Sequence, residues 1–198
     1  MTKRTIRRAA TVVIVAMLTT LIMAGTAVAH NGEQSLVYLD IFDSTIEGEI
    51  HYPVADLNEV LDLDIPLDAE DAVEWAEANP GIIENYSAEH IAISDIDGEQ
   101  WPIVFSGFDG LDVGTGAFLL AVFEVDREFT EVPRQFVVAY DGIFHAKPER
   151  DALLAIATDF GSGTFNNEAD TLVRYIPGST SQTVDLGDTS FWNCLLYT

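Results

Sequence analysis

The sequence predicts a mainly β protein: an antiparallel β-sandwich-like domain with a short helical insertion at about residues 56–89. Short segments rich in β-branched and aromatic residues recur along the chain, and turn signals separate them. Helical patterns are confined to one region and do not alternate with the strands. A parallel sheet built from βαβ units is therefore disfavoured, and a sandwich of short strands is favoured.

The first predicted element is a hairpin. Residues 36–42 are rich in β-branched and aromatic side chains and lead into a turn signal at 43–45. The return segment 46–52 alternates, with acidic residues and His51 on one face and apolar or small residues on the other. This alternation predicts an antiparallel pair with one face toward water, and it places His51 on that wet face.

Two capping patterns predict the start of the helical insertion. Asp56 is followed three residues later by Glu59, which is the spacing of an N-terminal cap for a short helix ending near residue 61. Asp68 is placed to cap a second helix at 69–78, with acids in its first turn where the helix dipole favours them.

A third helix is predicted from Pro80 towards Glu89. Proline is well suited to a first helical position, because its missing N–H has no partner there in any case. Helical spacing then places Ile83, Tyr86 and His90 on one stripe.

The remainder of the chain predicts strands, with a tight turn at Asp97-Gly98. The predicted strands are 90–95, 100–105, 117–125, 134–140, 152–158, 171–175 and 181–186. The turn region also looks like part of a calcium loop, but that pattern requires oxygen ligands where Ile93 and Val104 stand. A hairpin turn is the better interpretation.

Residues 1–29 have the order of an export signal: a basic start, an apolar stretch at 9–24 and the triplet Ala27-Val28-Ala29. Cleavage after Ala29 makes His30 the new N-terminus. The rival interpretation is an uncleaved anchor, since the apolar stretch approaches the length that a bilayer needs. We expect an exported protein, extracellular or on the outer face of the cytoplasmic membrane.

The exported part is expected to be one extracytoplasmic domain, residues 30–190, followed by a truncated tail at 191–198. The whole chain has a formal charge of −24. The leader contains no acid and four of the nine bases, so the remainder has 33 acids against 5 bases, a net charge of −28. A body this negative repels phosphate backbones and anionic headgroups, which argues against nucleic-acid partners and electrostatic membrane attachment.

No catalytic motif stands out in the sequence. Cys194 is the only cysteine, so no disulfide can form within the chain. Two carboxylates could catalyse the hydrolysis of a glycoside, but the chain has 33 acids, so the sequence cannot single out such a pair. We therefore expect a non-enzymatic protein, and an enzyme is the third choice behind the two functions considered below.

The four histidines are the most selective candidates for a site. An N-terminal His30 would offer an imidazole and a free α-amino group, a pair that suits Cu(II) or Ni(II). His51 is a poor partner, because the predicted hairpin places it opposite Val37, roughly 23 Å of extended chain from His30. His90 and His145 are not constrained by this argument, and either could instead be a structural histidine.

The order of segments resembles the extracytoplasmic N-terminal domain of HupE/UreJ-type membrane proteins. The matching pieces are AHNGEQSLVYLDI, EGEIHYPVADLNEVL, ENYSAEHIAISDIDGEQWPI, RQFVVAYDGIFHAKPERDALLAI and VDLGDTSFW. The resemblance implies a β-sandwich-like domain outside the cytoplasmic membrane, next to a multi-pass permease half proposed to move nickel, cobalt or a similar ion. Its matching histidines are His30, His90 and His145, the candidate metal ligands.

Two departures from the family pattern limit what the resemblance implies. Pro148-Glu149-Arg150 stands where relatives often carry another histidine. After residue 29, no segment is long and apolar enough to span a bilayer, whereas the family continues into membrane helices. We therefore expect a truncated relative or a free-standing version of the exported domain, not a permease.

Two functions remain after these exclusions. The first is a domain that binds a transition metal, nickel, cobalt or copper, or assists its transport together with a membrane permease. The second is a structural or protein-binding acidic β-sandwich with no metal role, which predicts histidines that lie apart from one another.

Overall fold

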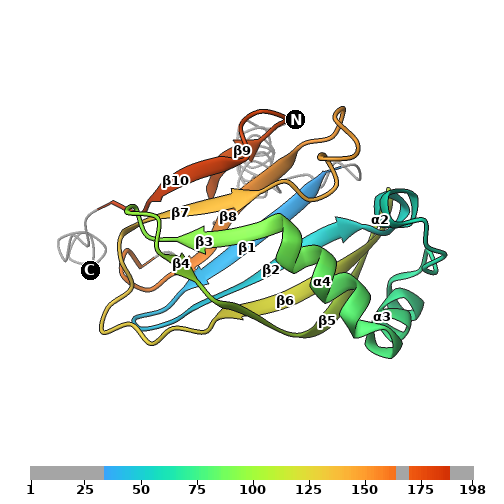
Figure 1. The fold of residues 1–198 in the computed structure, drawn as a ribbon. Helices are drawn as coiled ribbons and strands as arrows, with labels where there is room; N and C mark the ends of the chain where they lie inside the picture. The colour runs from blue at the N-terminus through green and yellow to red at the C-terminus, as the bar shows by residue number, and fades with distance from the viewer. Residues whose placement is uncertain (1–33, 164–169, 188–198) are drawn as a thin grey trace, which may run out of the picture. The chain divides into compact units, whose positions relative to one another are not determined.

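The computed structural model describes residues 34–163 and 170–187. The predicted leader, His30 and the tail at 191–198 lie outside these ranges. The described chain is mainly β, with two largely antiparallel sheets and three helices, which confirms the predicted fold class. The helices and the four-stranded sheet lie against one face of the six-stranded sheet (Figure 1).

The six-stranded sheet has the order β5-β6-β2-β1-β8-β9. Its central strands β1 and β2 form the predicted hairpin, in which Leu36 lies opposite His51, one residue away from the predicted register. The strands of this sheet are β1 (Ser35–Ile41), β2 (Ile46–Pro53), β5 (Ile103–Val113), β6 (Gly116–Val125), β8 (Ala152–Asp159) and β9 (Asp170–Tyr175).

One pairing in this sheet is parallel, although the sequence predicts antiparallel strands. Strand β1 pairs in parallel with β8, from Ser35 opposite Ala152 to Ile41 opposite Asp159. The two strands are more than a hundred residues apart in the sequence. No local pattern specifies which distant strand fills this position, because periodicity determines which face of a strand is buried and not which neighbour it selects.

The four-stranded sheet has the order β10-β7-β3-β4. Its strands are β3 (Ile91–Ser94), β4 (Gln100–Trp101), β7 (Gln135–Tyr140) and β10 (Ser181–Asp185). The predicted Asp97-Gly98 turn joins β3 to β4, and Gly98 has the positive φ of 92° that favours glycine. The predicted strand 100–105 is two strands, since the chain leaves this sheet after Trp101 and enters the other as β5.

Three helices cover the end of the core that the four-stranded sheet leaves open: α2 (Val54–Leu61), α3 (Ala69–Ala78) and α4 (Pro80–His90) (Figure 1). The predicted cap of α3 is confirmed, with the Asp68 carboxylate accepting from the N–H groups of Glu70 and Asp71. The predicted start of α4 at Pro80 is also confirmed. The predicted cap of α2 is wrong. That helix begins at Val54, so Asp56 lies within its first turn and its carboxylate serves a different purpose.

The core lies between the inner faces of the two sheets and the helices. Alternate residues of β1, such as Val37 and Leu39, are fully buried there, together with Leu57 of α2 and Ile83 of α4. Gly48 of β2 faces the same core and leaves room for Phe123 of β6. The inner face of the six-stranded sheet is therefore apolar throughout its central strands.

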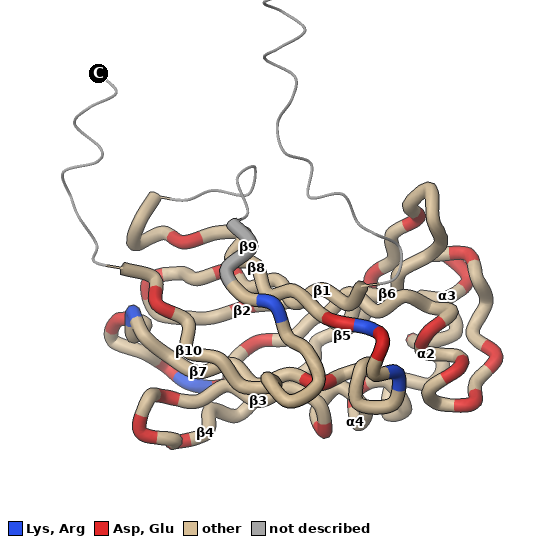
Figure 2. The backbone as a smooth tube through the Cα atoms, turned by 90° about the horizontal axis from the view of Figure 1, so that it is seen from above, with Lys and Arg blue, Asp and Glu red and all other residues tan. Residues whose placement is uncertain are grey.

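Each of the five bases after residue 29 forms an ion pair with a carboxylate from a different element, although acids far outnumber bases along the chain (Figure 2). The pairs are Arg127 with Glu99, Arg134 with Asp159, Lys147 with Asp56 and Glu59, Arg150 with Asp56, and Arg174 with Asp151. Three of the acids, Asp56, Asp151 and Asp159, are buried.

Within the described ranges, no helix combines the length and the apolar character needed to cross a membrane.

Gly48→Ala is expected to destabilise the domain by about 2 kcal/mol or more, because an added Cβ overpacks the core. That Cβ would lie 2.6 Å from both the Phe123 ring and the main-chain oxygen of Tyr38. The matched control is Gly114→Ala in the turn between β5 and β6, where an added Cβ meets nothing within 4 Å. Urea unfolding of both variants measures the difference, and equal stabilities would contradict the packing described here.

The Arg134–Asp159 pair is expected to make stability depend on pH. Burial alone raises the pKa of Asp159, but the hydrogen bonds from Arg134, at 2.7 and 2.8 Å, hold that pKa below its ordinary value. Because the folded-state pKa is depressed, the stabilisation is present above the unfolded pKa of about 3.9 and is lost as the pH falls through the lower folded value.

Asp159→Asn is accordingly expected to cost about 3 kcal/mol at neutral pH, and the difference from wild type should shrink as the pH falls below about 4. The control is Glu99→Gln, which removes an exposed pair and should change stability by less than about 1 kcal/mol. Urea unfolding across this pH range provides the measurement. A pH-independent cost for Asp159→Asn would show that the ion pair is not its cause.

Candidate metal centre

The structure brings together two of the three predicted metal-ligand candidates. His90 is the last residue of α4, and His145 lies in the turn segment that follows β7. Their rings stack with centroids 4.0 Å apart and an angle of 20° between the planes. The Tyr86 ring, one turn earlier on α4, packs against both, with centroid distances of 4.6 Å to His90 and 6.0 Å to His145.

Asp141 holds both imidazoles through their Nδ1 atoms. Its carboxylate lies 2.7 Å from Nδ1 of His90, and its main-chain oxygen lies 3.2 Å from Nδ1 of His145. A carbonyl or an ionised carboxylate can only accept a hydrogen bond, so each Nδ1 must carry the proton. A neutral ring in this tautomer has its lone pair on Nε2, which leaves both Nε2 atoms able to bind a metal ion.

The main chain strengthens this arrangement at the same residue. The Asp141 N–H donates to the main-chain oxygen of His90, and the His145 N–H donates to the main-chain oxygen of Asp141. Asp141 therefore contacts His90 through its carboxylate and its main-chain N–H, and it contacts both the ring and the main chain of His145 through its main-chain oxygen. The His90 side chain is 15% exposed, and His145 is exposed, so both rings lie at the surface where an ion can reach them.

The turn that carries His145 contains a strained residue. Ile143 has a φ of 63°, in the left-handed region that a β-branched side chain disfavours, and its side chain is buried. The Tyr86 hydroxyl accepts a 2.7 Å hydrogen bond from the Ile143 N–H. Burial raises the pKa of Tyr86 to about 12 despite this hydrogen bond, so the hydroxyl is neutral at physiological pH. Tyr86 thus fixes the turn as well as the stack.

An ion cluster fixes the chain just after His145. The Lys147 ammonium donates to Asp56 at 2.6 Å and to Glu59 at 2.5 Å, and Arg150 also pairs with Asp56. Asp56 is 3% exposed, so its carboxylate requires these partners. The cluster attaches the segment that carries His145 to helix α2.

The start of the described chain lies beside this turn. The Ser35 side chain lies next to the hydroxyl of Tyr140, the residue before Asp141. A Cβ added at Gly142 would lie 2.5 Å from the same hydroxyl, so the Tyr140 side chain folds back onto the turn. The first residue of β1 is therefore close to the segment that holds the histidine pair.

The remaining histidines do not join the pair. His30 lies outside the described residues. His51 is 5% exposed, lies 2.7 Å from the Glu49 carboxylate and packs on the Tyr38 ring, so the predicted wet position is wrong. In the described part of the chain, no three side chains of His, Cys, Asp or Glu are arranged to hold one ion together.

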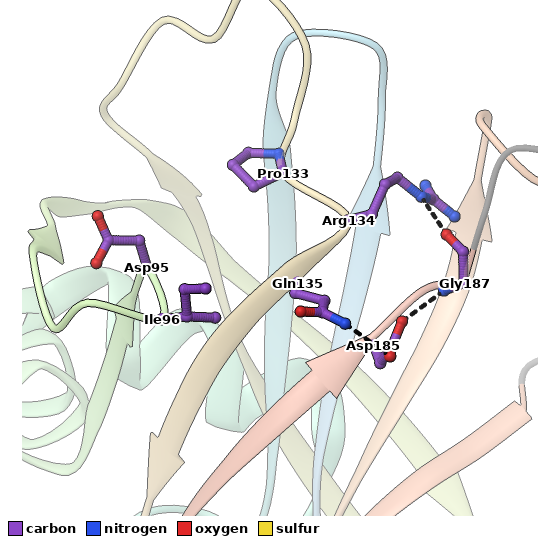
Figure 3. A pocket seen from close by; sticks show the side chains of 7 residues that line it. All are labelled: Asp95, Ile96, Pro133, Arg134, Gln135, Asp185 and Gly187. Carbon is purple, nitrogen blue, oxygen red and sulfur yellow. Dashed lines mark hydrogen bonds between the residues drawn. The ribbon is translucent and has the colours of Figure 1, made fainter.

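A hollow of about 550 Å³ lies at the other end of β3 and β7 from the histidine pair (Figure 3). Its walls include Asp95, Ile96, Gln135 and Asp185, with no His or Cys among its described lining residues. Arg134 also lines it, but its guanidinium is engaged by Asp159 and by main-chain oxygens. The described lining of the hollow therefore offers a transition metal neither an imidazole nor a thiolate.

Sequence reasoning missed Asp141 and Tyr86 as members of the site. The stripe of Ile83, Tyr86 and His90 on α4 was a usable signal for Tyr86, because it predicted that the tyrosine and the histidine share a helix face. Asp141 gave no signal of its own among so many acids. Its role depends on the pairing of β3 with β7, which places it next to His90.

Comparisons with models of known protein families and with curated proteins found no match.

Tyr86→Phe is expected to destabilise the domain by about 1–2 kcal/mol, because the buried Ile143 N–H loses its acceptor. We also expect the imidazole NMR signals of His145 to shift, since the turn is no longer fixed. The control is Tyr38→Phe, which removes the hydroxyl of a partly buried tyrosine on β1, away from the turn. If Tyr86→Phe changed neither stability nor the His145 signals, the hydroxyl would not position the turn.

Proposed function

We propose that this chain is a non-enzymatic exported domain that binds a transition metal ion, nickel, cobalt or copper, at His90 and His145. The observation that carries the proposal is that both rings are bonded to Asp141 through Nδ1, which leaves both Nε2 lone pairs available. Metal-ligating histidines characteristically donate their other N–H to a carboxylate or a main-chain carbonyl. This pair uses one acceptor of each kind.

The surroundings favour a cation at this position. His90 ends helix α4, where the last carbonyls carry the negative end of the helix dipole. Asp141 adds a formal negative charge within hydrogen-bond distance of the ring. Imidazole nitrogens suit nickel, cobalt and copper, whereas oxygen-rich sites suit magnesium and calcium. The donor set therefore favours a transition metal over the hard divalent ions.

Two nitrogen donors leave coordination positions of a metal ion open. The sequence offers His30 as a third ligand. His30 lies outside the described residues, so its part in the proposal rests on the sequence alone. If the leader is removed after Ala29, the α-amino group of His30 would supply a fourth nitrogen.

The assignment to metal transport rests on the sequence. The resemblance to the extracytoplasmic domain of HupE/UreJ-type proteins supports a role beside a membrane permease that moves nickel, cobalt or a similar ion. The leader at 1–29 supports export across the cytoplasmic membrane. In this proposal the domain holds the ion outside the membrane and delivers it to a permease partner.

A purely structural histidine pair is the second candidate. The observation that favours it is that each ring already has a hydrogen bond and a stacking partner within the fold. In that case the domain is a structural or protein-binding acidic β-sandwich, and the pair serves only to fix the turn on α4.

Calorimetric titration of the leader-free protein with Ni(II), Co(II) and Cu(II) is the test. His90→Asn and His145→Asn are the informative variants, because the asparagine amide can occupy the position of Nδ1 and keep the bond to Asp141 while Nε2 is lost. Each variant should lose affinity by at least about tenfold while keeping most of its thermal stability. Asp141→Asn should weaken binding through the His90 tautomer.

The control is His51→Asn, which removes an imidazole that lies apart from the pair and should leave affinity unchanged. His30→Ala, or one residue added before His30, tests the third ligand separately. Unchanged affinity in these N-terminal variants would remove His30 from the site. Wild-type affinity in both His90→Asn and His145→Asn would exclude the pair and favour the structural candidate.

A further inference from the structure

Three carboxylates stand side by side on neighbouring strands of the six-stranded sheet, near the turn that joins β1 to β2. Asp40 of β1 lies directly opposite Glu47 of β2, and Glu47 lies directly opposite Glu124 of β6. Directly opposed residues share a face and have Cβ atoms about 4.5–5.5 Å apart. We call Asp40, Glu47 and Glu124 the acidic row.

The acidic row lies on the outer face of the sheet. Its neighbours along each strand, Leu39, Ile46 and Phe123, point the other way into the core. The helices and the four-stranded sheet cover that inner face (Figure 1). Glu47 and Glu124 are exposed and Asp40 is partly exposed, so the row meets solvent.

No base of the described chain pairs with the acidic row. Every Lys and Arg after residue 29 forms an ion pair elsewhere, on Asp56, Glu59, Glu99, Asp151 or Asp159. Like charges directly opposite on a sheet are destabilising, and here two such pairs adjoin. The row also lies within a body whose net charge of −28 adds a repulsion of longer range.

The register cannot slip to separate these charges. A shift of one residue between β1 and β2 would turn core residues such as Leu39 and Ile50 to the outer face. The apolar core therefore holds the three carboxylates together, and at neutral pH mobile cations in the solvent can screen their repulsion. The screening length falls from about 8 Å at physiological ionic strength to about 3 Å at 1 M salt.

We propose that the folded state of this domain depends on high salt, and that the acidic row is the structural element through which cations stabilise the six-stranded sheet. The inference is independent of metal binding at the histidine pair. The acidic surface then makes the domain stable at high salt concentration and less stable as the salt is diluted.

Thermal unfolding of the leader-free protein from about 0.1 M to about 2 M KCl tests the proposal, since this range spans most of the change in screening length. Tm should rise steeply with KCl and equally with NaCl at the same ionic strength. Sucrose is the comparison, because it stabilises folded proteins by exclusion from their surface without screening charge. A Tm that is independent of KCl, or a rise that sucrose reproduces in full, would overturn the proposal.

The triple variant Asp40→Asn, Glu47→Gln, Glu124→Gln tests the acidic row itself. It should raise Tm at low salt by about 4 °C and make Tm less dependent on KCl. The matched control is Asp64→Asn, Glu77→Gln, Asp97→Asn, which removes the same charge from exposed positions in separate segments. If both triple variants flatten the salt dependence equally, overall charge is responsible and the assignment to the row is wrong.

Discussion

Three buried carboxylates impose the constraint on which the rest of the structure depends. A carboxylate can be buried only if a cation or several hydrogen bonds compensate for its lost hydration. Asp56, Asp151 and Asp159 are buried, and four of the five bases after residue 29 pair with them. Because the chain has so few bases, each of these ion pairs joins one particular pair of chain segments. Arg134 joins the start of β7 to the end of β8, and so links the two sheets.

The pairing of a buried carboxylate with scarce bases also positions the candidate metal centre. Lys147 and Arg150 attach the segment after β7 to helix α2 through Asp56. Tyr86 fixes the strained Ile143 turn within that segment. These contacts hold an exposed histidine against a helix-terminal one, an arrangement that a free surface loop would lose to side-chain entropy. A site built this way is preorganised by the packing around it, which is the condition for useful affinity from only a few donors.

The two faces of the six-stranded sheet differ in chemistry and have opposite effects on stability. The inner face is apolar and fixes the register of the strands. The outer face carries the acidic row in that same register, so the core determines which charges are forced together. Apolar burial on the inner face stabilises the sheet, and charge repulsion on the outer face partly opposes that stabilisation. The size of the repulsion depends on ionic strength. The histidine pair and the acidic row thus both arise from long-range packing.

The sequence by itself determined the elements whose signals are local. Alternation specified the hairpin at 36–52, Asp68 and Pro80 specified helix starts, and Asp97-Gly98 specified a turn, because periodicity and capping act over a few residues. Only the tertiary structure decided that β1 lies beside β8, that Asp56 pairs with Lys147 instead of capping a helix, and that His145 stacks on His90. These contacts join residues more than fifty positions apart. Their selection depends on the packing of the whole domain, which no local pattern encodes.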